Sequence, residues 1–101
     1  MDGSRSEGPR IELGSGATRV VFPLVLRETL IGRIDSNHVV LDHASVSRIH
    51  ARLHRVGDRI ELEDCGSSLG SQVNGELVDR VFLKHGDVVK LGAVSLLFLE
   101  D

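Results

Sequence analysis

Turn-forming residues interrupt this 101-residue chain about every six to twelve positions from residue 10 onward, which leaves room only for short strands. The segments between the turns are rich in Val, Leu and Ile, and none carries a sustained 3.6-residue period. We expect strands at 11–13, 19–24, 28–31, 39–41, 48–54, 59–63, 77–83, 88–91 and 94–99. About ten short strands at this spacing predict an all-β fold, a β-sandwich of two antiparallel sheets with polar loops at its ends.

Two-residue turns and a proline locate hairpins and an edge. Gly57-Asp58 predicts a tight turn between two strands, and Asn74-Gly75 is typical of a type I′ turn, in which both central residues take positive φ. Pro23 lies within a strand-like run, and it should occupy a sheet edge or a bulge because it cannot donate a hydrogen bond to a neighbouring strand.

Alternation of apolar and polar residues is clearest from 48 to 54. Ile49, Ala51 and Leu53 would face one way, while the Arg and His side chains between them face the other. Such a pattern predicts a strand with one face in the core and the other in solvent.

Composition limits the size and organisation of the domain. A chain of 101 residues, 41% of them hydrophobic, is long enough for one core but too short for two. The core must be aliphatic, because Trp and Tyr are absent and only three Phe are present. Residues 1–9 consist of Gly, Ser, Pro, Met and charged residues, which predicts a disordered tail ahead of a single domain over 10–101.

Charge and hydropathy bear on partners and location. No run of about 18 apolar residues exists to span a membrane, and the N-terminus lacks the apolar stretch of a signal peptide. The single cysteine, Cys65, allows no internal disulfide and suits an intracellular protein. A net charge of −3 argues against direct nucleic-acid binding. Between His43 and Arg55, however, there are three Arg, three His and no acidic residue, a local excess that suits a small anion.

Four residues in or beside turns offer the chemistry of a phosphate site. Arg33 and Arg48 each carry five N–H donors in a planar fork that matches phosphate oxygens. Ser47 and Ser68 add short hydroxyl donors. Each residue type is common in solvated turns, so none is diagnostic alone. Carried by loops at one end of a sandwich, the four together would form a phosphate clasp.

The spacing of these residues resembles that of a known family. Gly32-Arg33 precedes Ser47-Arg48-x-His50-Ala51, which is followed by Asp64-x-Gly66-Ser67-Ser68-x-Gly70-Ser71-x-Val73-Asn74-Gly75. This pattern resembles a forkhead-associated (FHA) domain over nearly all of residues 10–101. The resemblance implies an eleven-stranded, FHA/SMAD-like sandwich whose apical loops bind phosphothreonine in an extended peptide of a partner protein. It further implies a role in signalling, including DNA-damage or cell-cycle pathways, and a nuclear rather than cytoplasmic location.

The resemblance also implies a role for each matched residue. Arg33 would contact the phosphate, and Arg48 would add positive charge beside it. Ser47 would donate its hydroxyl to the phosphate, and Ser68 matches the small hydroxyl residue that also reaches it. The other matched residues would support the loops: Gly32 through backbone freedom at a strand end, His50 through hydrogen bonds from its ring, and Asn74 and Gly75 by shaping a hairpin.

Leu69 departs from the family pattern Ser-x-Asn-Gly-Thr, whose Asn holds the main chain of the bound peptide. A leucine at this peptide-contacting position can neither donate nor accept a hydrogen bond, and losing such bonds costs about 1–3 kcal/mol, or roughly 5- to 150-fold in affinity. The alternative to a phosphopeptide-binding module is therefore a phospho-independent scaffold or dimerisation module that self-associates through a sheet face or the apical loops.

Metal and enzyme sites find no support in the sequence. His50 and His54 are four residues apart on a predicted strand, so about 13 Å would separate them and one ion could not bind both. Gly66-Ser67-Ser68-Leu69-Gly70 has the Gly-x-Ser-x-Gly spacing, but no helix follows it as a nucleophile elbow requires, and the Gly-rich stretches lack the ending of a nucleotide-binding loop. Cys65 is expected to pack as a small apolar residue at the end of a strand. We therefore expect no metal, no cofactor and no enzyme activity.

Overall fold

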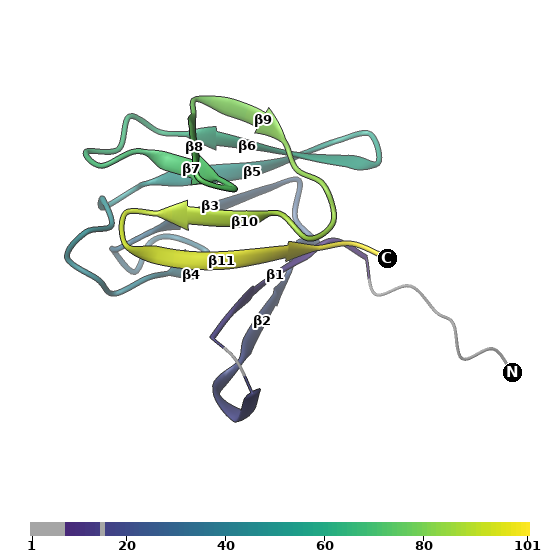
Figure 1. Ribbon diagram of the computed structural model, residues 1–101, viewed down its shortest axis with the longest axis horizontal. Helices are drawn as coiled ribbons and strands as arrows, with labels where there is room; N and C mark the ends of the chain where they lie inside the picture. Colours follow the sequence, from purple (N-terminus) through teal and green to yellow (C-terminus); the bar gives the residue numbers. More distant parts are fainter. Residues whose placement is uncertain (1–7, 15) are drawn as a thin grey trace, which may run out of the picture.

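Two β-sheets packed face to face form the fold in the computed structural model, which describes residues 8–14 and 16–101 (Figure 1). The strands in chain order are β1 (Arg10–Leu13), β2 (Val20–Pro23), β3 (Glu28–Gly32), β4 (Val39–Val40), β5 (Ala51–Val56), β6 (Arg59–Asp64), β7 (Ser71–Val73), β8 (Glu76–Val78), β9 (Arg80–Phe82), β10 (Val88–Leu91) and β11 (Val94–Leu99). A short 3-10 helix, η1 (Gly16–Thr18), lies between β1 and β2. The predicted all-β sandwich is confirmed.

The strands form a six-stranded sheet in the order β2-β1-β11-β10-β7-β8 and a five-stranded sheet in the order β4-β3-β5-β6-β9. Neighbouring strands are antiparallel, except that β3 and β4 run parallel, with Ile31 opposite Val39 and Gly32 opposite Val40. The prediction of purely antiparallel sheets is wrong for this pair. A strand of two residues carries no pattern from which its direction could be read, and the preceding loop sets that direction.

The predicted strand at 77–83 is in fact two strands in different sheets. Glu76–Val78 pairs with β7 in the six-stranded sheet, whereas Arg80–Phe82 pairs with β6 in the five-stranded sheet. The chain crosses between the sheets at Asp79, whose carbonyl accepts a hydrogen bond of 2.9 Å from the Asp64 N–H. Apolar residues lie on both sides of this crossing, so the local pattern gives no sign of it.

β5 begins at Ala51 rather than at residue 48. The side chain of Ile49 is 45% exposed and that of His50 is completely buried, which is the inverse of the predicted alternation. From Ala51 onward the prediction holds, since Ala51 and Leu53 are buried. The pattern fails at 48–50 because these residues close the preceding loop, where tertiary contacts rather than pleating decide which side chain points inward.

The local turn predictions are confirmed. Gly57-Asp58 joins β5 to β6, whose register runs from Val56 opposite Arg59 along both strands. At the β7–β8 hairpin, Asn74 has a φ of 52° and Gly75 a φ of 88°, as a type I′ turn requires. Pro23 lies in β2, the edge strand of the six-stranded sheet, where its missing N–H costs no ladder bond.

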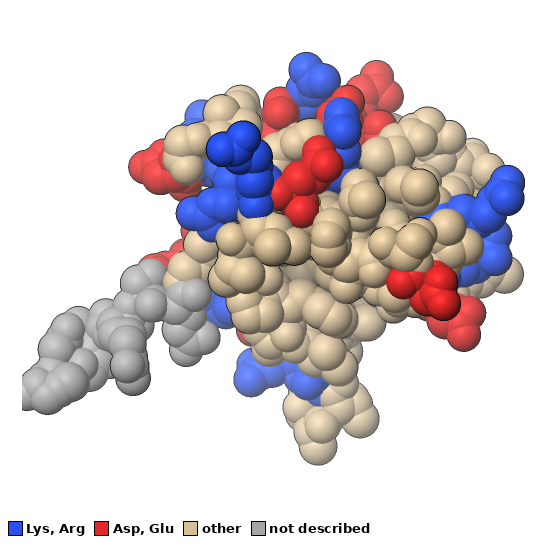
Figure 2. All heavy atoms as spheres, turned by 180° about the vertical axis from the view of Figure 1, so that it is seen from behind, with Lys and Arg blue, Asp and Glu red and all other residues tan. Residues whose placement is uncertain are grey.

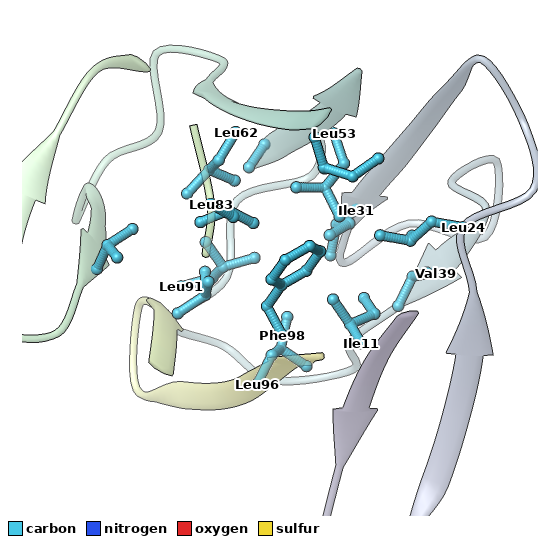
Figure 3. Packing of buried hydrophobic residues seen from close by; sticks show 14 of the residues in the cluster. Ile11, Leu24, Ile31, Val39, Leu53, Leu62, Leu83, Leu91, Leu96 and Phe98 are labelled. Carbon is cyan, nitrogen blue, oxygen red and sulfur yellow. The ribbon is translucent and has the colours of Figure 1, made fainter. Parts of the chain in front are cut away.

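Aliphatic side chains from both sheets fill the core, as the sequence predicted (Figure 3). Phe98 of β11 is completely buried in the middle of this cluster, and Ile11 of β1 and Leu91 of β10 come from strands of the same sheet. Leu53 and Leu62 are buried from the opposite sheet. Burial of such side chains stabilises a fold by about 1.5–3 kcal/mol each, and here it holds the two sheets together.

The loops that carry the predicted phosphate ligands lie together at the left-hand end of the molecule in Figure 1. They are the loop that follows β3, the loop that precedes β5, and the loop that joins β6 to β7. The predicted tail at residues 1–9 lies outside the described residues except for Gly8 and Pro9. The Pro9 carbonyl accepts a hydrogen bond of 2.9 Å from the Leu24 N–H, immediately before β1 begins.

Charged side chains form a cluster on the solvent-facing side of the five-stranded sheet. Glu63 accepts hydrogen bonds from His54 at 3.0 Å and from Arg52 at 2.9 Å through one oxygen, and from Arg80 at 3.2 Å through the other. Glu28 lies 3.2 Å from both Arg52 and His54. The bonds from His54, Arg52 and Arg80, in that order, lower the pKa of the Glu63 carboxyl to about 2.

This lowered pKa predicts a stability contribution that disappears in acid. Because the pKa of Glu63 falls from 4.5 to about 2 on folding, its contribution is complete above pH 4.5 and is lost as the pH falls through 2. Thermal unfolding of Glu63→Gln and of the parent should therefore differ near neutral pH and converge between pH 4.5 and 2. The matched control is Glu76→Gln, at an exposed residue of β8. The difference in thermal stability between this variant and the parent should not change between neutral pH and pH 2.

Candidate phosphate-binding site

Arg33 is anchored at the start of the loop after β3. Its backbone N–H donates to the Ser47 carbonyl at 3.0 Å, and its side-chain Nε donates to the Val46 carbonyl at 3.0 Å. The terminal Nη1 and Nη2 groups form no hydrogen bond with any described residue. The guanidinium is thus held from one side while its outer donors remain available to an anion.

Ser47 joins two loops through its side chain and backbone. The Ser47 Oγ accepts a hydrogen bond of 3.0 Å from the Ser68 N–H, and the Ser47 N–H donates to Nδ1 of His50 at 3.1 Å. Because the hydroxyl oxygen is used as an acceptor, its proton is free to be donated elsewhere. This geometry places Ser47 next to Ser68 although 21 positions separate them in the chain.

An open pocket of about 470 Å³ lies between these loops, and all four predicted phosphate ligands line it. The residues are Arg33, Ser47, Arg48, Ile49 and Ser68. The lining therefore contains two guanidinium groups, two hydroxyl groups and no carboxylate. Figure 2, which views the molecule from behind, shows one of several groups of Lys and Arg side chains at its right-hand end, where the loops from the left of Figure 1 lie, with Asp and Glu side chains beside it. Such a pocket is chemically suited to an anion.

The buried ring of His50 connects the two loops beneath this pocket. Nδ1 accepts the bond from Ser47, so the proton lies on Nε2, which donates to the Gly70 carbonyl at 2.8 Å. The backbone of His50 is also paired on both sides, with the Ile31 carbonyl and the Cys65 N–H, each at 2.9 Å. The ring bonds that the family resemblance implied for His50 are present in the structure.

Asp64 organises the loop between β6 and β7. One carboxylate oxygen accepts the N–H groups of Gly66 and Ser67, and the other accepts the hydroxyls of Ser67 and Ser71. Burial acts to raise the pKa of Asp64, but the hydrogen bonds from Ser67 and Ser71 outweigh it and hold the pKa below its ordinary value. Asp64 belongs to the sequence pattern quoted above, which predicted no role for it. The signal was present, since Asp two positions before Gly-Ser, as in Asp64-Cys65-Gly66-Ser67, is typical of a side chain that caps its own turn.

Gly32 supports the site for a reason different from the one predicted. Its φ is not positive, so backbone freedom is not what the position requires. A Cβ here would instead lie 2.2 Å from the Arg48 carbonyl oxygen and 2.8 Å from Nδ2 of Asn37. Asn37, which sequence reasoning missed, donates from the same nitrogen to the carbonyls of Ile34 and Arg48, at 2.7 and 2.8 Å. Close packing against this bridge allows only a glycine.

Asn74 and Gly75 do not line the phosphate pocket. Asn74 connects the β7–β8 hairpin to the start of β10: its Nδ2 donates to Asp87 and its Oδ1 accepts the Val88 N–H, both at 2.9 Å. Leu69 projects from the β6–β7 loop with 61% of its surface exposed, next to the pocket rather than in it. Cys65 is exposed, so the predicted apolar packing is wrong; β6 ends one residue earlier, at Asp64.

Two further features of the described residues bear on the site. Within residues 8–14 and 16–101, no group of three or more His, Cys, Asp or Glu side chains is arranged to hold a metal ion. In the same part of the chain, no helix has the length and apolar character to cross a membrane.

Both the sequence and the fold of this chain match those of known proteins. The family model described as the FHA domain matches residues 29–92. A solved structure from a structural and functional study of phosphothreonine-dependent FHA domain interactions superimposes with a TM-score of 0.84. It is 27% identical and covers 91% of this chain and 95% of that chain.

Two curated relatives are regulatory by name. The oxoglutarate dehydrogenase inhibitor of Corynebacterium jeikeium is 38% identical over 78 residues, which are 77% of this chain and 54% of that protein. The glycogen accumulation regulator GarA of Mycolicibacterium smegmatis is 39% identical over 71 residues, which are 70% of this chain and 45% of that protein. The chain thus spans about half the length of the curated relatives it matches.

These relatives correct the predicted location. Both come from bacteria, which have no nucleus. The predicted nuclear location is therefore wrong. It followed from an association of this kind of domain with nuclear signalling, and neither composition nor any targeting motif in the chain supported it.

The steric account of Gly32 predicts the cost of adding one methyl group. Gly32→Ala should lower the free energy of unfolding by about 1–3 kcal/mol, because the new Cβ must displace the Arg48 carbonyl or the Asn37 side chain. Urea denaturation measures this loss. Ser36→Ala, in the exposed part of the same loop, should change stability by less than about 0.5 kcal/mol. An equally small change in Gly32→Ala would contradict the close contact.

Proposed function

The chain belongs to the FHA domain family, and from this premise we propose that it is a binding module that recognises a phosphothreonine peptide of a partner protein. The observation that carries the proposal is the pocket that Arg33, Ser47, Arg48 and Ser68 line together without any carboxylate. A phosphothreonine carries a charge of about −1.5 to −2 at pH 7 and three strong acceptor oxygens. Two guanidinium groups and two hydroxyls provide the matching charge and donors.

Each residue has a distinct part in this proposal. Arg33 binds the phosphate through Nη1 and Nη2, since its Nε is already bonded to the Val46 carbonyl. Ser47 donates its hydroxyl proton, and Ser68 donates its own hydroxyl from the neighbouring loop. Arg48, which is exposed at the rim of the pocket, adds charge. Ile49 provides one apolar wall that a threonine methyl group can contact, a residue that sequence reasoning did not assign to the site.

The proposed role is binding rather than catalysis. The named relatives are an inhibitor and a regulator, and the pocket holds donors for an anion but no activated nucleophile. We propose that the chain acts in signalling, by bringing a phosphorylated partner to whatever protein contains this domain. The relatives' names concern metabolism, so they favour metabolic regulation over the DNA-damage and cell-cycle pathways that the resemblance first suggested.

A second candidate function rests on Leu69. Its exposed side chain stands beside Ser68, where the family pattern has an amide that holds the peptide main chain. This favours, as the alternative, a phospho-independent scaffold that self-associates through the apical loops. Sedimentation of the unphosphorylated protein distinguishes the two: a concentration-dependent dimer supports the scaffold, and a monomer at all concentrations argues against it.

Substitution of Arg33 tests the phosphate contact. Arg33→Ala should weaken binding of a phosphothreonine peptide by about 10- to 150-fold, because charge-assisted hydrogen bonds contribute about 1.5–3 kcal/mol. Isothermal calorimetry with the phosphorylated and unphosphorylated peptides measures this effect. Arg27→Ala changes the net charge equally at an exposed residue before β3 and should leave affinity unchanged. Absence of binding to every phosphothreonine peptide pool at millimolar concentration would refute the proposal.

Restoring the family amide tests the role of Leu69. Leu69→Asn should tighten phosphopeptide binding by up to about 1–3 kcal/mol, because the amide can bond the peptide main chain from the same loop. Calorimetry with the same peptide measures the gain. Val25→Asn replaces another exposed apolar residue, 78% exposed, and should have no effect. An unchanged affinity in Leu69→Asn would show that the bound peptide does not pass over this residue.

A further inference from the structure

We propose that a second pocket, next to the phosphate pocket, binds a lysine or arginine side chain of the same peptide. The domain would then select phosphothreonine with a basic residue close to it in sequence. This inference rests on the proposed function, because it needs the phosphate to be held by Arg33 and its neighbours. It adds a specificity-determining site on the other side of the β6–β7 loop.

The second pocket adjoins the first through one residue. It has a volume of about 400 Å³ and is open to solvent, and Ser68 lines both pockets. An extended peptide advances about 3.3 Å per residue, and lysine and arginine have long side chains. A basic residue within about three positions of the phosphothreonine can therefore reach the second pocket while the phosphate occupies the first.

The charge of the second pocket is opposite to that of the first. Asp64 and Asp79 both line it, and no Lys, Arg or His does. The two residues face each other where the Asp64 N–H donates to the Asp79 carbonyl at 2.9 Å. Two carboxylates without a basic side chain beside them give the lining a negative charge, which attracts a cation.

The Asp79 carboxylate is available to such a cation. Across residues 8–14 and 16–101, no side chain or backbone group forms a hydrogen bond or ion pair with it. Arg80, the next residue, is directed to Glu61 and Glu63 instead. Asp64 is bonded, but its partners in the loop are neutral N–H and hydroxyl groups, so its negative charge remains.

Two leucines give the pocket apolar walls that suit the stem of a basic side chain. Leu69 is 61% exposed and Leu77 is 71% exposed, and both line the pocket. Leu77 lies over the loop backbone, since a Cβ on Gly70 would be only 2.7 Å from its Cδ2 atom. Lysine and arginine cover apolar surface with their methylene groups while the charged end reaches polar groups. Leucine walls combined with a free carboxylate therefore suit a lysine or arginine side chain better than a purely apolar or an acidic one.

A positional scan of one peptide tests the proposal. The parent peptide has only alanine, serine and glycine around a central phosphothreonine, so its flanking residues are uncharged. Arginine, lysine or leucine replaces one residue at a time at the three positions on either side. Arginine at one or two positions on one side should tighten binding by roughly 2- to 5-fold, the range of an exposed ion pair. Citrulline, which keeps the shape of arginine without its charge, should abolish the gain at those positions.

Variants of the protein assign the gain to this pocket. Asp79→Asn should remove the arginine preference while leaving affinity for the parent phosphopeptide unchanged. Leu77→Ser should reduce the preference for both arginine and lysine. Asp58→Asn, in the β5–β6 turn at the opposite end of the molecule in Figure 1, changes net charge equally and should retain the preference.

The outcomes separate this inference from the function on which it rests. If the parent phosphopeptide binds but no position favours arginine, or if the preference survives Asp79→Asn, the basic-residue pocket is refuted and the phosphate site stands. Stronger binding of leucine than of arginine at the same positions also refutes it, in favour of an apolar subsite. If the parent phosphopeptide does not bind at all, both proposals fail.

Discussion

The buried imidazole of His50 joins the loops on which the binding end of this domain depends. Its Nδ1 accepts the N–H of Ser47, and its Nε2 donates to the Gly70 carbonyl, so both nitrogens are used. A ring with no exposed surface cannot exchange these bonds for bonds to water, and losing either partner would leave a buried polar group unpaired. The Ser47 side chain then receives the Ser68 N–H. One ring therefore sets the separation of the two loops whose residues line the phosphate pocket.

The contacts of Gly32 and the hydrogen bonds of the Asp64 carboxylate hold the other loop segments of the binding end in place. Gly32 lets the chain pass against the Arg48 carbonyl, and the Asp64 carboxylate accepts four hydrogen bonds from the β6–β7 loop and the first residue of β7. Ser68 thus comes to lie between a pocket lined by two arginines and a pocket lined by two aspartates. Opposite charges in adjacent pockets favour a peptide whose own charges alternate in the same way, and they disfavour one with two acidic groups.

Sequence patterns predicted the elements whose contacts are local. The strands at 88–91 and 94–99 form a hairpin over those same residues, and Asn74-Gly75 takes the two positive φ angles that its type I′ turn requires. Predictions failed where a distant segment decides the structure. The chain crosses from one sheet to the other at Asp79, between β8 and β9, where the Asp79 carbonyl pairs with the N–H of Asp64, 15 positions earlier (79 − 64). His50 turns inward, against the alternation of its neighbours, because its ring bonds the Gly70 carbonyl, 20 positions later, as well as the nearby Ser47 N–H.

The amino-acid order alone was enough to specify an aliphatic β-sandwich, its hairpin turns, and the set of arginine and hydroxyl residues suited to phosphate. These properties depend on residue type and short spacing, which a linear chain displays directly. It could not specify that Gly32 is required by a neighbouring carbonyl, that Ile49 rather than Leu69 lines the phosphate pocket, or that Asp64 and Asp79 share a second pocket. Those facts arise only when loops distant in sequence are packed at one end of two sheets, since burial and close approach are properties of the folded arrangement.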